Sequence, residues 1–175
     1  IMEERVCLEV YEQIFDDFFP LIMAGDHSTS YGTIAGIKKA FPKKRIGVIW
    51  IDAHADIHTP YTTPSGNMHG MPLAMAFGFD NYECKVNDPR GETVDYWEQI
   101  KNVGMQGPKI TPEDLVYIAV RDLEKPENYL LNKYNINFIE VEEVKKHGAA
   151  TIAGKALQML DHCDVIYVSF DVDSI

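Results

Sequence analysis

Short apolar runs alternate along the chain with segments whose apolar residues recur at helical spacing. The runs are strand-like, most of them rich in β-branched residues as in strands buried on both faces of a parallel sheet. They cover residues 18–24, 45–51, 115–120, 136–141 and 165–170. Helices are predicted over residues 2–16, 28–41, 71–77, 94–102, 126–134 and 149–161. This alternation predicts an α/β domain with a mostly parallel central sheet covered by helices.

Residues 78–112 interrupt this alternation with Asn, Asp, Pro, Gly and charges, which predicts a surface excursion with a short helix. No repeat, low-complexity stretch or linker divides the chain, so residues 1–175 are expected to form a single domain. The chain begins with Ile1 and stops at Ile175, just after a strand-like run. We therefore expect a domain cut at both ends, with its carboxyl-terminal part missing.

Composition limits the partners and the compartment. The 175 residues hold 16 Lys and Arg against 27 Asp and Glu, a net charge of −11, which argues against nucleic acid or an anionic membrane as partner. The 3 cysteines lie far apart, as expected of free thiols in a reducing compartment rather than of disulfides or structural zinc. The charge-free stretch 57–79 is too polar to span a membrane. A cytoplasmic protein is predicted.

Acidic residues and histidines follow three of the strand-like runs. The clusters are Gly25–Ser28, Asp52–Asp56 and Asp171–Asp173. Ligands of open α/β sheets bind beyond the carboxyl ends of the strands, where these clusters fall. Alternate residues of an extended stretch point the same way, so Asp52, His54 and Asp56 are expected to converge, as are Asp171 and Asp173.

With His27, these residues supply four carboxylates and two imidazoles. Such a concentration of negative charge is costly without counter-charge, and two divalent cations would balance it. The donor types suit Mn²⁺, with Co²⁺, Fe²⁺ or Zn²⁺ as substitutes, and two-metal sites are hydrolytic. Any one cluster alone would be an ordinary turn or cap, whereas three clusters at three strand ends favour a metal site.

A polar loop over residues 62–72 lies between these clusters and contains small hydroxyls, an amide and a histidine. It could hydrogen-bond a polar substrate, and its histidine could move protons. The alternative is an ordinary Thr/Ser/Gly turn. Closeness in sequence to Asp56 favours the substrate-binding interpretation.

The motifs together resemble those of the ureohydrolase family, which comprises arginases, agmatinases, guanidinobutyrases and formimidoylglutamases. AGDHS is similar to the family's GGDHS, DAHAD to DAHxD and SFDVD to SFDxD, in the family's order. SGNMHGMP and VRDLEKPENYLL resemble arginases most. The resemblance implies a three-layer α/β/α fold and a hydrolase of linear amidines. It also implies a homo-oligomer, a trimer or hexamer.

The resemblance further implies two Mn²⁺ per subunit and hydrolysis of L-arginine to L-ornithine and urea. One ion would bind His27, Asp52, Asp56 and Asp171. The other would bind Asp52, His54, Asp171 and Asp173. His69 matches a histidine proposed to shuttle protons, and Asp56 would also act in catalysis by orienting the reacting groups. Asp122 matches a supporting aspartate near the metals.

Substrate contacts are implied at Ser65 and Asn67, which match positions that hold the amino acid's carboxylate, with help from Thr63. Two positions depart from the arginase pattern. His58 replaces an Asn that touches the substrate carboxylate, and Glu124 replaces an Asp that reaches the α-amino group. A glutamate that grips the guanidinium lies beyond the matched segment in the family.

Other functions stay open. Agmatine lacks a carboxylate, so an agmatinase would need the substrate loop less; another guanidino or formimino hydrolase is a further alternative. A binuclear metallophosphoesterase also uses D-x-H and G-D motifs, but there D-x-H comes first, whereas here it follows Gly25-Asp26. A catalytically inert fragment is the non-enzyme alternative. His147 and His162 are expected to be surface or packing residues.

Overall fold

The computed structural model describes residues 2–174, which form two compact units. The helical unit comprises the residues up to 43 together with 56–109. The sheet unit comprises residues 44–55 and those from 110 onward. The single domain expected from the sequence stays a prediction.

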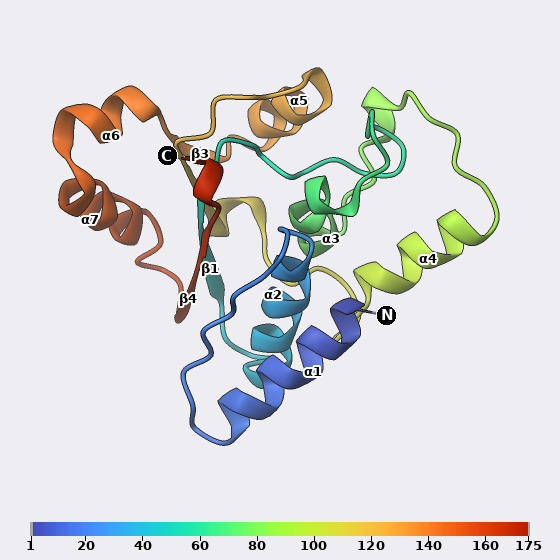
Figure 1. The fold of residues 1–175 in the computed structure, drawn as a ribbon, viewed down its shortest axis with the longest axis horizontal. Coiled ribbons are helices and arrows are strands. Elements are labelled where there is room, and N and C mark those ends of the chain that lie inside the picture. The colour runs from blue at the N-terminus through green and yellow to red at the C-terminus, as the bar shows by residue number, and fades with distance from the viewer. Residues whose placement is uncertain (1, 175) are drawn as a thin grey trace. The chain divides into compact units, whose positions relative to one another are not determined.

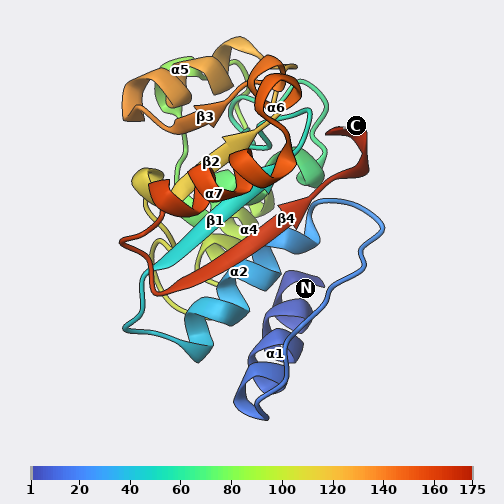
Figure 2. The ribbon, with the colours of Figure 1, turned by 90° about the vertical axis from the view of Figure 1, so that its left-hand side faces the viewer.

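The sheet unit contains four parallel strands in the order β3-β2-β1-β4 (Figure 2). They are β1 (Ile46–Ile51), β2 (Leu115–Ile118), β3 (Asn137–Ile139) and β4 (Val165–Phe170). The residues of β1 and β2 are almost entirely buried, as their apolar, β-branched sequences predict. The α/β class and the parallel sheet predicted from the sequence are thus confirmed.

The register brings the carboxyl ends of three strands to one edge of the sheet. Ile51 pairs with both Ile118 and Phe170. The ladder then ends with two further backbone bonds, from Asp52 N to Ile118 O at 3.2 Å and from Asp171 N to Ile51 O at 2.8 Å. The acidic residues after β1 and β4 therefore emerge side by side.

Three helices complete the sheet unit: α5 (Lys125–Tyr134), α6 (Val141–His147) and α7 (Ala149–Met159). Figure 2 shows α6 and α7 over one face of the strands. The side of α7 that carries Ile152 and Ala156 belongs to the same buried cluster as Ile49 of β1 and Val116 of β2. Burial of these side chains is what holds the helix against the sheet.

The helical unit is built on α1 (Met2–Phe15) and α2 (Thr29–Ala40), which lie against each other (Figure 1), together with α3 (Pro72–Phe77) and α4 (Glu92–Lys101). Glycines in α2 allow the close approach of α1. A Cβ at Gly36 would lie 2.6 Å from the carbonyl oxygen of Cys7, so only a residue without a side chain fits at this position.

Most predicted elements are confirmed to within two residues at each end, including all six predicted helices. The strand predicted at 18–24 is wrong: these residues have no strand structure. Pro20 lacks a backbone donor, and Phe19 and Met23 are 92% and 93% exposed, so this apolar run pairs with no sheet among the described residues.

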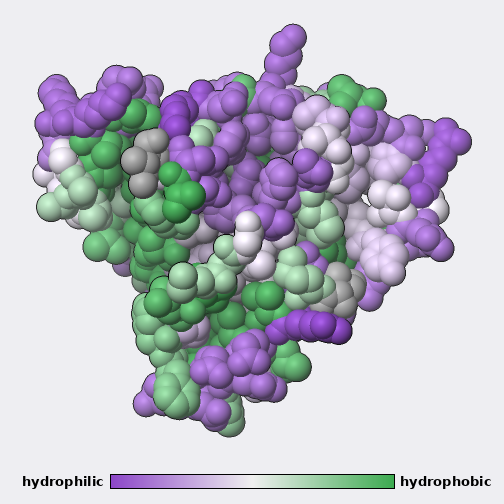
Figure 3. Space-filling model, viewed as in Figure 1, coloured by the Kyte–Doolittle hydropathy of each residue, from purple (hydrophilic) through white to green (hydrophobic). Residues whose placement is uncertain are grey.

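Residues 78–112 are less superficial than expected. They form α4 and a 3-10 turn, Tyr82–Cys84, and the Trp97 side chain of α4 is buried. Residues 18–24, which form no strand, contribute an exposed apolar surface. It is visible in Figure 3 along the path that this segment follows in Figure 1. No helix in the described part of the chain is long and apolar enough to cross a membrane.

Candidate active site

Three potential metal ligands converge at the carboxyl edge of the sheet unit. His54 Nδ1 lies 3.1 Å from Asp173 Oδ2 and 3.4 Å from Asp52 Oδ1. One ligand atom from each of these residues falls within 4.8 Å of the others, a spacing at which a single cation could contact all three. Asp52 is only 1% exposed, whereas the other two side chains are about half exposed, so the group opens to solvent on one side.

The Asp52 carboxylate is fixed by two donors from its own strand end. Trp50 Nε1 donates to Oδ2 at 3.0 Å, and the backbone N–H of His54 donates to Oδ1 at 2.8 Å. Hydrogen bonds of this kind favour the ionised carboxylate and fix its orientation. A buried carboxylate held by N–H groups is therefore ready to bind a cation.

Asp173 reaches the group through a turn rather than through an extended strand. Residues Val172–Ser174 form a 3-10 turn, in which Ser174 N donates to Asp171 O at 3.2 Å and Asp171 Oδ1 accepts Asp173 N at 3.1 Å. The extended geometry expected for Asp171 and Asp173 is therefore wrong, because β4 ends at Phe170 and the chain turns directly after it. Arg121 Nη2 fixes the turn by donating to Asp173 O at 2.7 Å.

The helical unit contributes a separate ligand pair. His27 Nδ1 lies 3.1 Å from Asp56 Oδ2, and both side chains are about 10% exposed or less. Asp56 has a φ of 47°, a left-handed conformation that is uncommon for a residue other than glycine. This conformation ends the extended stretch assumed for Asp52–Asp56.

Asp26, the residue before His27, organises the start of α2. Its Oδ1 accepts the backbone N–H of Ser28 at 2.9 Å and the Ser28 hydroxyl at 2.5 Å. These bonds lower the pKa of Asp26, with smaller contributions from the imidazoles of His69 and His27. The Asp26 carboxylate is thus engaged in a turn with Ser28 just before α2, and the adjacent imidazole is the metal-ligand candidate.

The polar loop presents two of its predicted substrate contacts to solvent. Ser65 and Asn67 are exposed, and Ser65 Oγ accepts the backbone N–H of Asn67 at 3.2 Å. Thr63 is buried, and its Oγ1 accepts the backbone N–H of Gly66 at 3.0 Å. These bonds hold the loop in a turn that displays a hydroxyl and an amide.

The half-buried Asn87 and the buried His58 anchor this loop. Asn87 Nδ2 donates to Thr63 O at 2.6 Å and to Pro60 O at 3.2 Å. His58 is 7% exposed, and its Nδ1 lies 3.1 Å from Thr62 Oγ1. Because Nδ1 faces this hydroxyl, a substrate carboxylate contact at His58 would have to use Nε2. His69 is exposed on the 3-10 turn Met68–Gly70 that follows the loop.

Two predicted residues of the sheet unit lie after β2. Asp122 Oδ2 is 4.0 Å from His54 Nε2, and the two residues form an isolated parallel bridge. This places Asp122 beside a candidate ligand, where it could orient the imidazole. Glu124 is exposed and precedes α5, where Glu127 Oε2 accepts its backbone N–H at 3.0 Å.

The sequence matches known proteins over almost its whole length. A model of the arginase family matches residues 2–175. The chain belongs to the arginase family. It is 33% identical to an arginase of Bacillus subtilis and 36% identical to one of Emericella nidulans, over 98% of this chain in each case. The chain spans about half the length of these curated relatives, 52% and 50%.

Solved structures agree with this family assignment. A Bacillus subtilis arginase superposes with a TM-score of 0.80 at 33% identity, covering 97% of this chain and 52% of that one. An Entamoeba histolytica arginase in complex with L-ornithine gives 0.76 at 35% identity, covering 98% of this chain and 54% of that one. A Bacillus subtilis formimidoylglutamase at 22% identity and a TM-score of 0.70 shows a shared fold.

The arginase-family motifs identify the candidate metal ligands but not the residues that hydrogen-bond these ligands and the substrate loop. Trp50, for which no role at the site was predicted, donates its indole N–H to Asp52. Arg121 and Asn87 fix the carbonyl groups of Asp173 and Thr63 and were not predicted. The sequence offers one signal: Trp50 stands two residues before Asp52 in a strand, so both side chains face the same side.

Proposed function

We propose that the protein is a binuclear-manganese hydrolase that cleaves the guanidino group of L-arginine to give L-ornithine and urea. The observation that carries this proposal is the convergence of Asp52, His54 and Asp173 within 4.8 Å, in a chain of the arginase family. The His27–Asp56 pair of the helical unit supplies further donors of the same type. The Entamoeba histolytica relative solved with L-ornithine supports the product assignment.

The donors fit manganese. Every candidate ligand offers a carboxylate oxygen or an imidazole nitrogen, and a cation beside the buried Asp52 carboxylate would balance its negative charge. Two Mn²⁺ would be held by His27, Asp52, His54, Asp56, Asp171 and Asp173. When bound, such ions would lower the pKa of a water molecule and would stabilise the negative charge that develops in the reaction.

The residues around the ions would orient the reactants and move protons. Asp56 is nearly buried and paired with His27, so its carboxylate can accept a hydrogen bond from the attacking water or the leaving amine. His69 is exposed on its turn and can exchange protons with solvent. An imidazole suits this role because its ordinary pKa lies near neutral pH.

The loop would select an amino acid over a simple amine. Ser65 and Asn67 are exposed and polar, which suits them to bind the α-carboxylate, and Thr63 supports their turn. His58 would add a contact through Nε2. The exposed Glu124 would receive the α-amino group, with a side chain one methylene longer than in the arginase pattern.

Urea release tests this proposal directly. The protein is stripped of metal, restored with Mn²⁺ and assayed separately with L-arginine and agmatine. Urea from L-arginine, well above that from agmatine and only after manganese is restored, is the expected result. Asp52→Asn should abolish the urea release that Mn²⁺ restores. Asn128→Asp, on the exposed face of α5, is the control and should leave this activity intact. Equal or greater urea from agmatine would overturn the substrate assignment, and none from either would overturn the reaction.

We also infer that the protein acts in the cytoplasm as a homo-oligomer, a trimer or hexamer. Its 3 cysteines are free, which suits a reducing compartment. The oligomeric inference rests on the resemblance to the ureohydrolase family. Light scattering coupled to size-exclusion chromatography measures it: a monomer at micromolar concentration would contradict it.

A further inference from the structure

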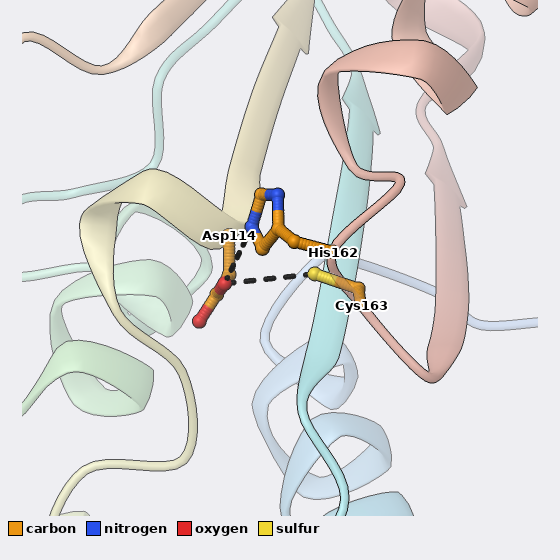
Figure 4. A group of neighbouring side chains, drawn as sticks. All are labelled: Asp114, His162 and Cys163. Carbon is orange, nitrogen blue, oxygen red and sulfur yellow. Dashed lines mark hydrogen bonds and ion pairs between the residues drawn. The ribbon is translucent and has the colours of Figure 1, made fainter.

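A second group of metal-ligand side chains lies at the opposite edge of the sheet from Asp52 and Asp173. Asp114 ends the turn that leads into β2, and His162 and Cys163 precede β4, so all three stand at the amino ends of strands (Figure 4). The proposed hydrolytic reaction uses none of them. Their side chains point toward one another across the start of the sheet.

The distances within this group match those of a tetrahedral zinc site. Asp114 Oδ1 lies 3.2 Å from His162 Nε2 and 3.5 Å from Cys163 Sγ, and the three ligand atoms fall within 4.8 Å of one another. Bonds of about 2.0–2.3 Å at tetrahedral angles separate neighbouring ligand atoms by about 3.3–3.6 Å. The side chains would therefore need little movement to meet one ion.

We propose that Asp114, His162 and Cys163 form a zinc site distinct from the hydrolytic centre, with solvent as the fourth ligand. The donors are one carboxylate oxygen, one imidazole nitrogen and one sulfur, a combination that zinc accepts and that the oxygen-preferring Mn²⁺ does not favour. The side chain of Asp114 is 3% exposed and that of His162 is 34% exposed. The group is therefore buried at the carboxylate and accessible to solvent at the imidazole.

The surrounding charges favour a cation. Carboxylates outnumber basic groups around the cluster: the acidic residues are Glu113, Asp114, Asp161 and Asp164, and the basic ones are Lys44 and Arg45. Asp161 Oδ1 lies 3.9 Å from His162 Nδ1, on the far side of the ring from Asp114. At this distance the carboxylate makes no direct hydrogen bond to the ring, and it contributes only its negative charge to the attraction for a cation.

Arg45 is the competing cation. Its Nε donates to Asp114 Oδ1 at 2.5 Å, and its guanidinium also pairs with Glu113. The other oxygen of Asp114 accepts two bonds from Thr111, at 3.0 and 2.8 Å, so the carboxylate cannot rotate away. Zinc would share Oδ1 with Arg45 or displace it toward Glu113, and we expect binding to be weaker than at a four-ligand structural site.

A role for Cys163 as a reactive thiol is less consistent with its surroundings. Burial, and then the neighbouring carboxylate of Asp114, raise the pKa of the Cys163 thiol to about 12. The free thiol therefore stays protonated at neutral pH and is a poor nucleophile. A bound divalent cation is the group that removes this proton, because a coordinating thiol is deprotonated.

Cobalt titration of the metal-stripped protein tests the site. Co²⁺ replaces zinc in tetrahedral sites, and only a sulfur ligand gives the thiolate-to-cobalt charge-transfer band in the near ultraviolet, so carboxylate and imidazole sites do not contribute to it. We expect this band to appear and to be displaced by Zn²⁺. Cys163→Ser should abolish the band, whereas Cys84→Ser, at a cysteine outside every candidate metal group of the described residues, should leave it intact.

Zinc affinity gives a second measurement. His162→Ala should weaken Zn²⁺ binding at this site, measured by the Zn²⁺ concentration that displaces the thiolate-to-cobalt band, by about tenfold or more. His147→Ala, at the end of α6, is the matched control and should leave this affinity unchanged. Circular dichroism of each metal-free variant verifies its fold. Absence of the cobalt band in the folded wild-type protein, or its persistence in Cys163→Ser, would overturn the proposal, and so would equal zinc affinity in His162→Ala and wild type.

Discussion

Gly36→Ala tests whether close contact between α1 and α2 holds the helical unit together. The added Cβ would lie 2.6 Å from Cys7 O and 2.8 Å from Val10 Cβ, well inside the optimum of about 3.5–4.0 Å. Overpacking of this kind costs about 1–3 kcal/mol, and replacing a helical glycine by alanine returns about 0.8–1.0 kcal/mol. The backbone oxygen cannot swing aside as a side chain would. The cost should therefore lie in the upper part of this range, about 2–3 kcal/mol, which leaves a net loss of about 1–2 kcal/mol.

Gly154→Ala is the matched control, because a Cβ at this position in α7 meets nothing within 4 Å. It should stabilise the protein by about 0.5–1 kcal/mol through helix propensity alone. Urea unfolding at 25 °C, followed by circular dichroism, gives the free energy of unfolding for both variants and the wild type. The variants should shift the midpoint in opposite directions. Equal stabilisation by Gly36→Ala would refute the tight packing inferred for the two helices.

Three further substitutions test other parts of the molecule. Burial lowers the pKa of Lys109 from 10.5 to about 8. Between pH 8 and 10.5 the unfolded chain therefore binds more protons than the folded one, so the free energy of unfolding should rise with pH. Lys109→Met should remove that rise in urea unfolding curves, and a pH profile equal to that of the wild type would contradict this assignment. Trp50→Phe removes the donor to Asp52 Oδ2 and should weaken Mn²⁺ binding about tenfold by calorimetry; equal affinity would assign the indole to packing alone. Asn87→Ala removes the donor to Thr63 O and should raise KM for L-arginine about fivefold with little change in kcat; a fall in kcat alone would contradict a loop-positioning role.

Sequence patterns predicted the position of the long strands better than their burial. The runs that became β1 and β4 are continuous, apolar and β-branched, and their observed bounds differ from the predicted ones by at most one residue. Of the two, β1 is almost entirely buried, whereas β4, the last strand in the sheet order, is largely half-buried or exposed. The run at 18–24 is equally apolar but remains unpaired and exposed. Hydrophobicity shows that a segment can be buried, whereas the presence of a neighbouring strand depends on distant parts of the chain.

The candidate active site was predictable as a set of residue types and less so as a geometry. The spacing of Asp52 and His54 placed both at one strand end, where they meet Asp173. The expectation of extended backbone failed at the 3-10 turn after β4 and at the positive φ of Asp56. These conformations depend on hydrogen bonds to other parts of the chain, and the spacing of residues in the sequence gives no information on those bonds.

The two edges of the sheet explain why one group was predicted and the other was not. At the carboxyl edge, the ligands lie in short contiguous motifs, and parallel strands bring the ends of those motifs together whatever the connections between them. At the amino edge, His162 and Asp114 are 48 positions apart, and each belongs to an unremarkable turn. Their meeting depends on the lengths of the connections into β2 and β4. A metal site built in this way leaves only an isolated His-Cys pair in the sequence, so it becomes visible only once the register of the sheet is known.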